Sequence, residues 1–122
     1  GLSYTTFSYG EIKLSSDSAS GDKGSITASV IVTNTGSVEG EEVVQMYIGD
    51  PAASISRPLK ELKGFQKVSL QPGESKEVSF TIDTGCLSFY GSDYKYHWEP
   101  GVFNLFIGTN SRDNKQTTFT WK

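Results

Sequence analysis

Carboxylates are the residues of this chain with the widest capacity for chemistry, because fourteen of its 122 residues are Asp or Glu. Two carboxylates held about 5 to 10 Å apart across a cleft can act as acid and base in the hydrolysis of a glycosidic bond. Here the acids border predicted strands or lie in turns and polar loops, where solubility and turn formation explain them. The acids in such places are Glu41, Glu42, Asp50, Glu74, Asp83 and Asp93. The sequence therefore predicts no catalytic residue within this chain.

The chain has one histidine, His97, and one cysteine, Cys86. A single imidazole excludes a metal site built on several histidines. A triad of His97 with a distant serine and aspartate is arithmetically possible, but its place between Tyr96 and Trp98 favours a half-buried sheet residue. Cys86 cannot close an internal disulfide and is expected to be buried as a small apolar residue. No glycine-rich phosphate loop opens a helix, so we expect neither a metal nor a cofactor.

Aromatic rings are densest near the C-terminal third of the chain, at Phe89, Tyr90, Tyr94, Tyr96 and Trp98. Flat rings with a polar group can stack on sugar faces, which makes Tyr94, Tyr96 and Trp98 candidates for a sugar contact. Alternate rings on a strand also fill a sandwich core or a domain contact, because aromatic residues dominate both. The second interpretation is favoured, and the first stays open.

The bulk composition is typical of one folded domain. Hydrophobic residues make up 35% of the chain and charged residues 20%, with a net charge of −3. The eleven basic residues are scattered, so nucleic acid is not an expected partner. No stretch of about 18 apolar residues indicates a membrane span, and no signal peptide is visible. We expect a single domain over residues 1–122. A single cysteine cannot form an internal disulfide, so the cysteine content does not indicate the cellular compartment.

A period of two dominates the chain and predicts strands with one buried face. The clearest case is 25–33, where Ile26, Ala28, Val30 and Val32 alternate with polar residues. Residues 42–49 have less distinct faces, with apolar residues on both sides, as in a strand that is covered on both faces. Further strands are predicted at 7–14 with a one-residue slip, 59–70 with a bulge or bend near Gly64, 76–83, 94–98, 102–107 and 117–121.

Turn signals separate these strands at about the spacing expected of β-sandwiches. Asn34 to Ser37 and Gln71 to Glu74 carry turn residues, and residues 94–98 and 102–107 are expected to form a hairpin. Residues 84–92 fit a short helical turn or extended chain, and 108–115 fit a polar loop. The fold class is therefore all-β, an antiparallel sandwich of about seven or eight strands, with an up-and-down barrel as the alternative.

Several blocks in order along the chain carry a resemblance to a known family. They are GLSYTTF (1–7), VTNTG (32–36), EEVVQMY (41–47), SRPLKELKGFQK (56–67), LQPGES (70–75), LSFY (87–90) and EPGVF (99–103). The chain resembles the fibronectin type III-like, immunoglobulin-like domain that ends many family-three glycoside hydrolases of the β-glucosidase type. The first block resembles the junction with the preceding domain of that family, so the start looks like an excised edge.

The resemblance implies a non-catalytic accessory role. In that family the nucleophilic aspartate belongs to an N-terminal barrel and the acid/base residue to an α/β sandwich domain, and neither segment is in this sequence. The complete protein would be a retaining exo-acting β-glycosidase. This piece would brace its catalytic domains and could lend a loop near the substrate cleft, in a region where Tyr94 to His97 departs from relatives.

The bracing role leads to candidate interface residues. Pro58 fixes its own φ and biases Arg57 towards extended backbone, which presents the guanidinium to a carboxylate on a neighbouring domain. A solvated arginine beside an edge strand is the alternative. Lys60 belongs to the same segment, and Tyr4 and Phe7 are expected to pack where the domains join.

Two competing functions stay open from the sequence. The first is a carbohydrate-binding module that uses Tyr94, Tyr96 and Trp98 on an oligosaccharide. The second is an immunoglobulin-like module that binds a separate protein.

Overall fold

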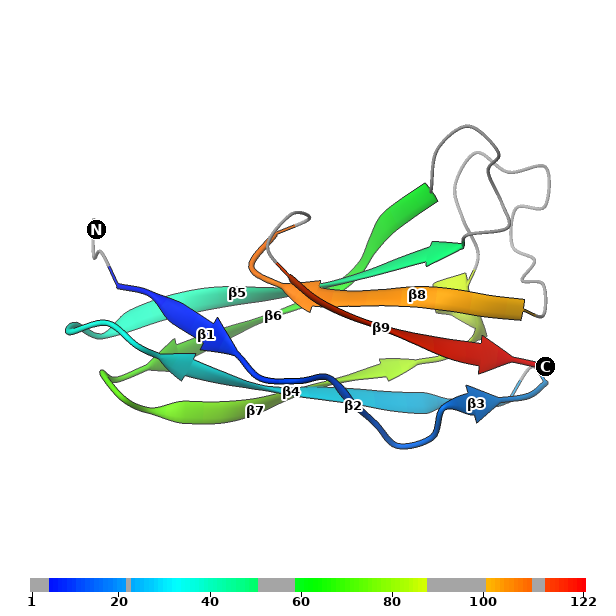
Figure 1. Ribbon diagram of the computed structural model, residues 1–122, viewed down its shortest axis with the longest axis horizontal. Coiled ribbons are helices and arrows are strands. Elements are labelled where there is room, and N and C mark those ends of the chain that lie inside the picture. The colour runs from blue at the N-terminus through cyan, green and yellow to red at the C-terminus, as the bar shows by residue number, and fades with distance from the viewer. Residues whose placement is uncertain (1–4, 22, 51–58, 88–100, 111–113) are drawn as a thin grey trace.

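The computed structural model describes residues 5–21, 23–50, 59–87, 101–110 and 114–122. Figure 1 shows the strands of these segments in two layers, as the predicted sandwich requires. The described strands are β1 Phe7–Tyr9, β2 Lys13–Leu14, β3 Ser18–Ala19, β4 Ile26–Asn34, β5 Gly40–Asp50, β6 Leu59–Leu70, β7 Ser75–Ile82, β8 Gly101–Gly108 and β9 Asn114–Trp121. The one helix among them is a 3₁₀ turn over Thr84–Leu87, which is too short to cross a membrane.

β4 is the centre of the four-stranded sheet. It pairs antiparallel with β7 along one edge and with β1 and β2 along the other. Its alternate residues Ile26, Ala28, Val30 and Val32 are buried, as the period-two pattern predicted. The alternation of apolar residues along one face was therefore sufficient to predict β4 from the sequence.

The predicted opening strand over 7–14 is wrong in detail, because the structure has two short strands there. β1 pairs with residues 32–34 of β4 and β2 with residues 28–29. Between them Gly10 donates to the carbonyl of Ile31 at 2.8 Å, so the break is only local. The chain then changes layers, and β3, which the sequence pattern missed, pairs parallel with β9 in the other sheet. Two-residue strands are too short to show a period.

The five-stranded sheet has the order β3-β9-β8-β5-β6. β5 pairs with β6 on one side and with β8 on the other, both antiparallel. The β5–β6 register shifts between Met46, which faces Gly64, and Tyr47, which faces Leu62. Lys63 is therefore an extra residue in β6, and the bulge predicted near Gly64 is confirmed.

The core lies between the two sheets and draws on both. Trp121, Phe103 and Phe119 are its largest fully buried side chains. The Phe103 and Phe119 rings stack with centroids 5.5 Å apart, and Trp121 meets Phe119 edge-on at 6.3 Å. The Trp121 indole donates to the carbonyl of Gly21 at 3.0 Å, so its buried polar atom is satisfied. Two open sheets around one core exclude the barrel alternative.

The predicted turns at 34–37 and 71–74 are both confirmed, and Asn34 is hydrogen-bonded within both of them. In the turn from Gln71 to Glu74, Gly73 has a φ of +79° and the Glu74 amide donates to the Gln71 carbonyl at 2.9 Å. Gly73 is the third residue of the turn and directly follows Pro72. A positive φ at this position is the type II geometry that favours glycine. The Asn34 backbone makes two hydrogen bonds to this turn. Its amide donates to the Glu74 carbonyl, and its carbonyl accepts from the Gly73 amide.

The remaining boundaries follow the predictions closely, except at one loop. The expected loop over 108–115 is shorter, because β9 begins at Asn114 and pairs with Gly108. Polar residues extend this strand because the ladder bonds are made by the backbone. The helical turn expected near Cys86 is present. The neighbours of β8 are β5 and β9, while the predicted hairpin partner at 94–98 lies outside the described residues.

Candidate functional site

Most of the side chains predicted to contact a sugar or a neighbouring domain lie outside the described residues. This holds for the sugar candidates Tyr94, Tyr96 and Trp98 and for the interface candidates Tyr4, Arg57 and Pro58, and His97 also lies outside the described residues. Lys60 lies in β6 opposite Gly49 of β5, and the structure describes its backbone alone. Phe7 is described, and it is half-buried in β1 against the core.

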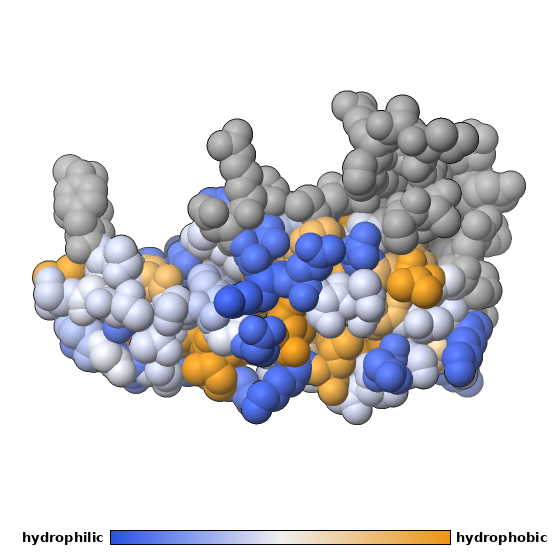
Figure 2. All heavy atoms as spheres, viewed as in Figure 1, coloured by the Kyte–Doolittle hydropathy of each residue, from blue (hydrophilic) through white to orange (hydrophobic). Residues whose placement is uncertain are grey.

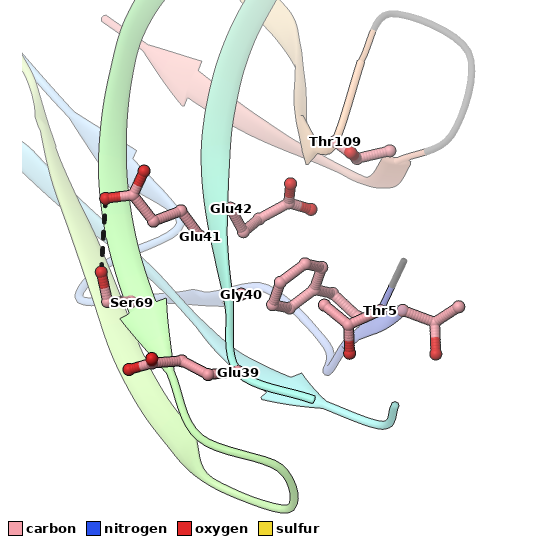
Figure 3. Close-up of a pocket in the computed structure, with 9 residues that line it drawn as sticks. Thr5, Glu39, Gly40, Glu41, Glu42, Ser69 and Thr109 are labelled. Carbon is pink, nitrogen blue, oxygen red and sulfur yellow. Dashed lines mark hydrogen bonds between the residues drawn. The ribbon is translucent and has the colours of Figure 1, made fainter. Parts of the chain in front are cut away.

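Phe7 lines a broad surface groove of about 830 Å³ where β1 meets the start of β5. The other lining residues are Thr5, Thr6, Glu39, Gly40, Glu41, Glu42, Ser69 and Thr109. Figure 3 shows Glu41 and Glu42 turned to opposite sides of β5, as neighbours in a strand must be. They do not face each other across the groove, so they are not arranged as an acid and base pair.

Each acid of the groove has a hydrogen-bond partner. The Glu39 carboxylate accepts from Gln71 at 2.6 Å, and Glu41 accepts from Ser69 at 3.4 Å. Glu42 accepts from the Tyr9 hydroxyl at 2.8 Å. These contacts join the start of β5 to β6, to the 71–74 turn and to β1. The acids of the groove thus hold strands together.

Tyr9 is the titratable group of this region with the most altered environment. Burial raises the pKa of its hydroxyl well above the ordinary value, and the hydrogen bond and charge of Glu42 add to the effect. A phenol held in its neutral form donates steadily to Glu42. Burial also raises the pKa of the half-buried Cys86 thiol. A thiol that stays protonated is a poor nucleophile, which fits the expectation of an apolar role.

The outer side of the five-stranded sheet carries a group of apolar and aromatic side chains that sequence reasoning did not single out. We call it the β5–β6–β8 face, made of Val43, Gln45, Tyr47, Leu62, Phe65 and Phe106. Leu62, Tyr47 and Phe106 are direct cross-strand neighbours in one row. Phe65 is 65% exposed and Leu62 49% exposed, while Tyr47 and Phe106 are half-buried, so the exposed apolar surface of this face lies on β6.

The outer side of the four-stranded sheet is different. It presents hydroxyl groups that bond across the β4–β7 ladder, Ser29 to Ser79 at 3.1 Å and Thr33 to Ser75 at 2.6 Å. Ile31, 39% exposed, is an apolar exception on β4. Figure 2 views the sandwich from the side and shows hydrophobic residues interspersed with hydrophilic ones where the layers meet. The two outer faces therefore suit different surroundings, water for the hydroxyls and a cover for the rings.

The sequence held one signal for the β5–β6–β8 face. The pattern of 42–49 predicted a strand covered on both faces, and Val43 and Tyr47 are indeed half-buried on its outer side. Leu62 and Phe65 gave no comparable signal, because residues three apart in a regular strand point to opposite faces. The extra residue Lys63 puts both on the same side.

Comparison with known proteins assigns the family. The fibronectin type III-like domain family matches residues 42–111, more than half of the chain. The chain belongs to this family. The match confirms both the predicted resemblance and the predicted all-β sandwich, and this fibronectin type III-like domain is of the kind that occurs in family-three β-glucosidases.

Its relatives are much longer glycosidases. The domain is 55% identical to a periplasmic β-glucosidase of Salmonella typhimurium, over 98% of this chain and 15% of that protein. It is 49% identical to a putative β-xylosidase of Formosa agariphila, over 100% of this chain and 16% of that protein. The chain therefore spans about one sixth of the length of the relatives it matches.

Solved structures give the same picture. A β-glucosidase from Erythrobacter marinus superposes with a TM-score of 0.86 at 40% identity, covering 100% of this chain and 16% of that one. A β-glucosidase from Listeria innocua, solved with laminaribiose, gives a TM-score of 0.80 at 39% identity over 100% of this chain and 17% of that one. In each case the whole fibronectin type III-like domain corresponds to a small part of a larger glycosidase.

Proposed function

We propose that this fibronectin type III-like domain is the accessory domain of a β-glucosidase-type glycoside hydrolase and braces the catalytic domains of the same polypeptide. One observation carries the proposal: nearly the whole chain matches about one sixth of several glycosidases, at up to 55% identity. A domain that covers so small a share of each enzyme, and whose described groove acids bond to neighbouring strands, is suited to support rather than to chemistry.

The complete protein is, on this proposal, a retaining exo-acting β-glycosidase with its reacting carboxylates outside this chain. Phe7 is the member of the proposed domain contact whose side chain is described, and it lies half-buried in β1, where it lines the groove. Tyr4, Arg57, Pro58 and Lys60 are the other proposed contact residues, and Lys60, opposite Gly49, lies at the far end of the β5–β6 ladder from the Phe7 groove. Burial of aromatic and arginine side chains is typical of the centres of such contacts.

The test uses an aryl β-glucoside and three proteins: this chain alone, the longer polypeptide that contains it, and that polypeptide without it. We expect no turnover above background from the chain alone. The longer polypeptide is expected to hydrolyse the substrate and to lose thermal stability when the domain is removed. Turnover by the isolated chain would overturn the proposal. So would a truncated enzyme that keeps full activity and an unchanged melting temperature.

A further inference from the structure

We infer that the β5–β6–β8 face is the surface on which a neighbouring domain of the same polypeptide docks, with Phe65 as its central apolar anchor. The inference rests on the proposed function and deepens it, because it names a contact surface separate from the Phe7 groove. The expected partner is a folded domain that presents an apolar patch. Four features of the structure support this assignment.

The first feature is the bulge that orients the anchor residues. Leu62 and Phe65 lie on the outer side together only because Lys63 is inserted between them in the β5–β6 ladder. Gly64 beside it permits the close approach of β6 to the core, since a Cβ there would lie 3.3 Å from the Phe80 ring. The bulge therefore puts two large apolar side chains on the outer side, where a regular strand would turn one of them towards the core.

The second feature is composition. The middle of the face consists of aliphatic and aromatic side chains and the uncharged Gln45, whose amide oxygen accepts a hydrogen bond from the Tyr47 hydroxyl. Among the described side chains of these three strands, charge reaches the outer side only at one end, with Glu41 and Lys67. Lys63 is engaged with Glu61 at 3.1 Å. Depletion of charge around exposed aromatic residues is typical of the centre of a protein interface.

The third feature is the contrast between the two sides of one molecule. The outer side of the four-stranded sheet has cross-strand hydroxyl pairs, which suit water. Phe65 and Leu62 are more exposed than Ile31, the apolar exception on that side. An exposed apolar patch with polar surroundings marks an interaction site more often than chance exposure does.

The fourth feature selects the occupant. The relatives extend far beyond this domain, which is 15% to 16% of their length, so the nearest available surface belongs to the same polypeptide. Covalent connection gives that surface a high effective concentration. A face without charged groups at its centre also matches a permanent contact between domains better than a reversible contact with water-soluble sugar.

The experiment measures the accessibility of cysteine probes in a Cys86→Ala background. Phe65→Cys, Ser79→Cys and Thr109→Cys report on the β5–β6–β8 face, the opposite sheet and the Phe7 groove. Each is labelled with a maleimide in the chain alone and in the longer polypeptide. We expect the Phe65→Cys probe to react roughly ten-fold or more slowly in the longer polypeptide, and the Ser79→Cys probe to react equally fast in both.

A second measurement guards against misfolded variants. Phe65→Thr and the matched Ile31→Thr both place a β-branched residue at an exposed strand position. Both are expected to leave the melting temperature of the chain alone nearly unchanged. In the longer polypeptide, only Phe65→Thr is expected to lower the melting temperature and the activity at raised temperature.

Each result bears on the inference. Slow labelling of the Phe65→Cys probe in the longer polypeptide supports it. If only the Thr109→Cys probe is slowed, the domain still braces its neighbours but through the groove, and the inference is wrong. If no probe is slowed, the docking surface and the bracing role both fail. Protection of the Phe65→Cys probe in the chain alone, by added cellobiose or by self-association seen in sedimentation, would also overturn the inference.

Discussion

At the scale of single residues, the Asn34 side chain makes four hydrogen bonds with other described residues. It is fully buried, and its amide group donates to the carbonyls of Val38 and Leu70, both at 2.9 Å. Its carbonyl oxygen accepts from the Thr5 hydroxyl at 2.6 Å and from the Gly36 amide at 2.9 Å. One side chain thus joins the start of the chain, the turn after β4 and the end of β6.

Replacement of Asn34 by alanine is expected to lower the free energy of unfolding by about 2 to 4 kcal/mol, because buried partners lose their bonds together. Urea titration of the chain alone would measure the change. Thr35→Ala is the control: its side chain is exposed and bonds only Thr6 among the described residues, so a change within about 0.5 kcal/mol is expected. Equal losses in both variants would contradict the role assigned to Asn34.

Tyr9 gives the chain a predicted pH dependence of stability. Its pKa is raised in the folded state, mainly by burial and further by Glu42. The pKa of a tyrosine in an unfolded chain is about 10. Above that pH the unfolded chain loses a proton that the folded chain keeps. The stabilising contribution is therefore complete below about pH 10 and declines as the pH rises further.

Urea titrations between about pH 8 and 11 would test this dependence. Tyr9→Phe should be less stable at the lower pH by about 1 kcal/mol, through the lost hydrogen bond, and should lose less stability as the pH rises. Glu42→Gln keeps an acceptor and removes the charge, so an intermediate slope is expected. Identical slopes for the original chain and Tyr9→Phe would contradict the assignment.

At the scale of elements, turns and bulges fix how the strands meet. The 71–74 turn connects β6 in one sheet to β7 in the other, and Asn34 bonds it from β4. β6 is an edge strand that side chains link to β7. The Gln66 side chain of β6 donates to the carbonyl of Ser79 in β7, and the Lys76 side chain of β7 donates to the carbonyl of Ser69 in β6. These bonds and the Lys63 bulge make β6 a poor template for pairing with other chains.

Gly73→Ala is expected to lower the free energy of unfolding by about 1 to 2 kcal/mol, because its φ of +79° is unfavourable for a side chain. Gly10→Ala is the matched control. A Cβ at Gly10 would make only ordinary contacts, 3.7 Å from the Ile31 carbonyl oxygen, so we expect a change within about 0.5 kcal/mol. Thermal or urea unfolding measures both, and a Gly73→Ala variant as stable as Gly10→Ala would contradict the turn assignment.

At the scale of the whole molecule, the C-terminal strand closes the sandwich. β9 lies between β3 and β8, and its Trp121 packs in the core. The amide of Lys122 donates to Ala19 at 2.8 Å, and the Gly21 amide donates to the Lys122 carbonyl at 3.1 Å. The last described residues are therefore bonded to the segment where the chain changes layers.

Trp121→Ala is expected to cost about 3 to 5 kcal/mol of unfolding free energy, since it opens a cavity in the core and leaves the Gly21 carbonyl without the indole donor. Thr118→Val on the exposed side of the same strand is the control and should change stability by less than about 1 kcal/mol. Calorimetry of the two variants measures the difference. A small loss for Trp121→Ala would show that β9 is not essential to the core.

The sequence by itself determined most of the described strands, such as β4 and β7, and the positions of two turns. Side-chain alternation and the φ preferences of Asn34 and Gly73 are local properties of the chain, so they can be recognised without knowing any partner. The same local reasoning failed for β3 and for the start of β9. A two-residue strand has no measurable period, and polar residues enter a strand when the backbone of a neighbour supplies the bonds.

Only the tertiary structure decided the strand order, the change of layers after β2 and the identity of the β5–β6–β8 face. Phe65 is exposed because of the register between β5 and β6. Glycine suits position 64 because the ring of Phe80, which is distant in sequence, lies 3.3 Å from where a Cβ would be. Such outcomes depend on contacts between residues far apart in sequence, whose geometry no local pattern encodes.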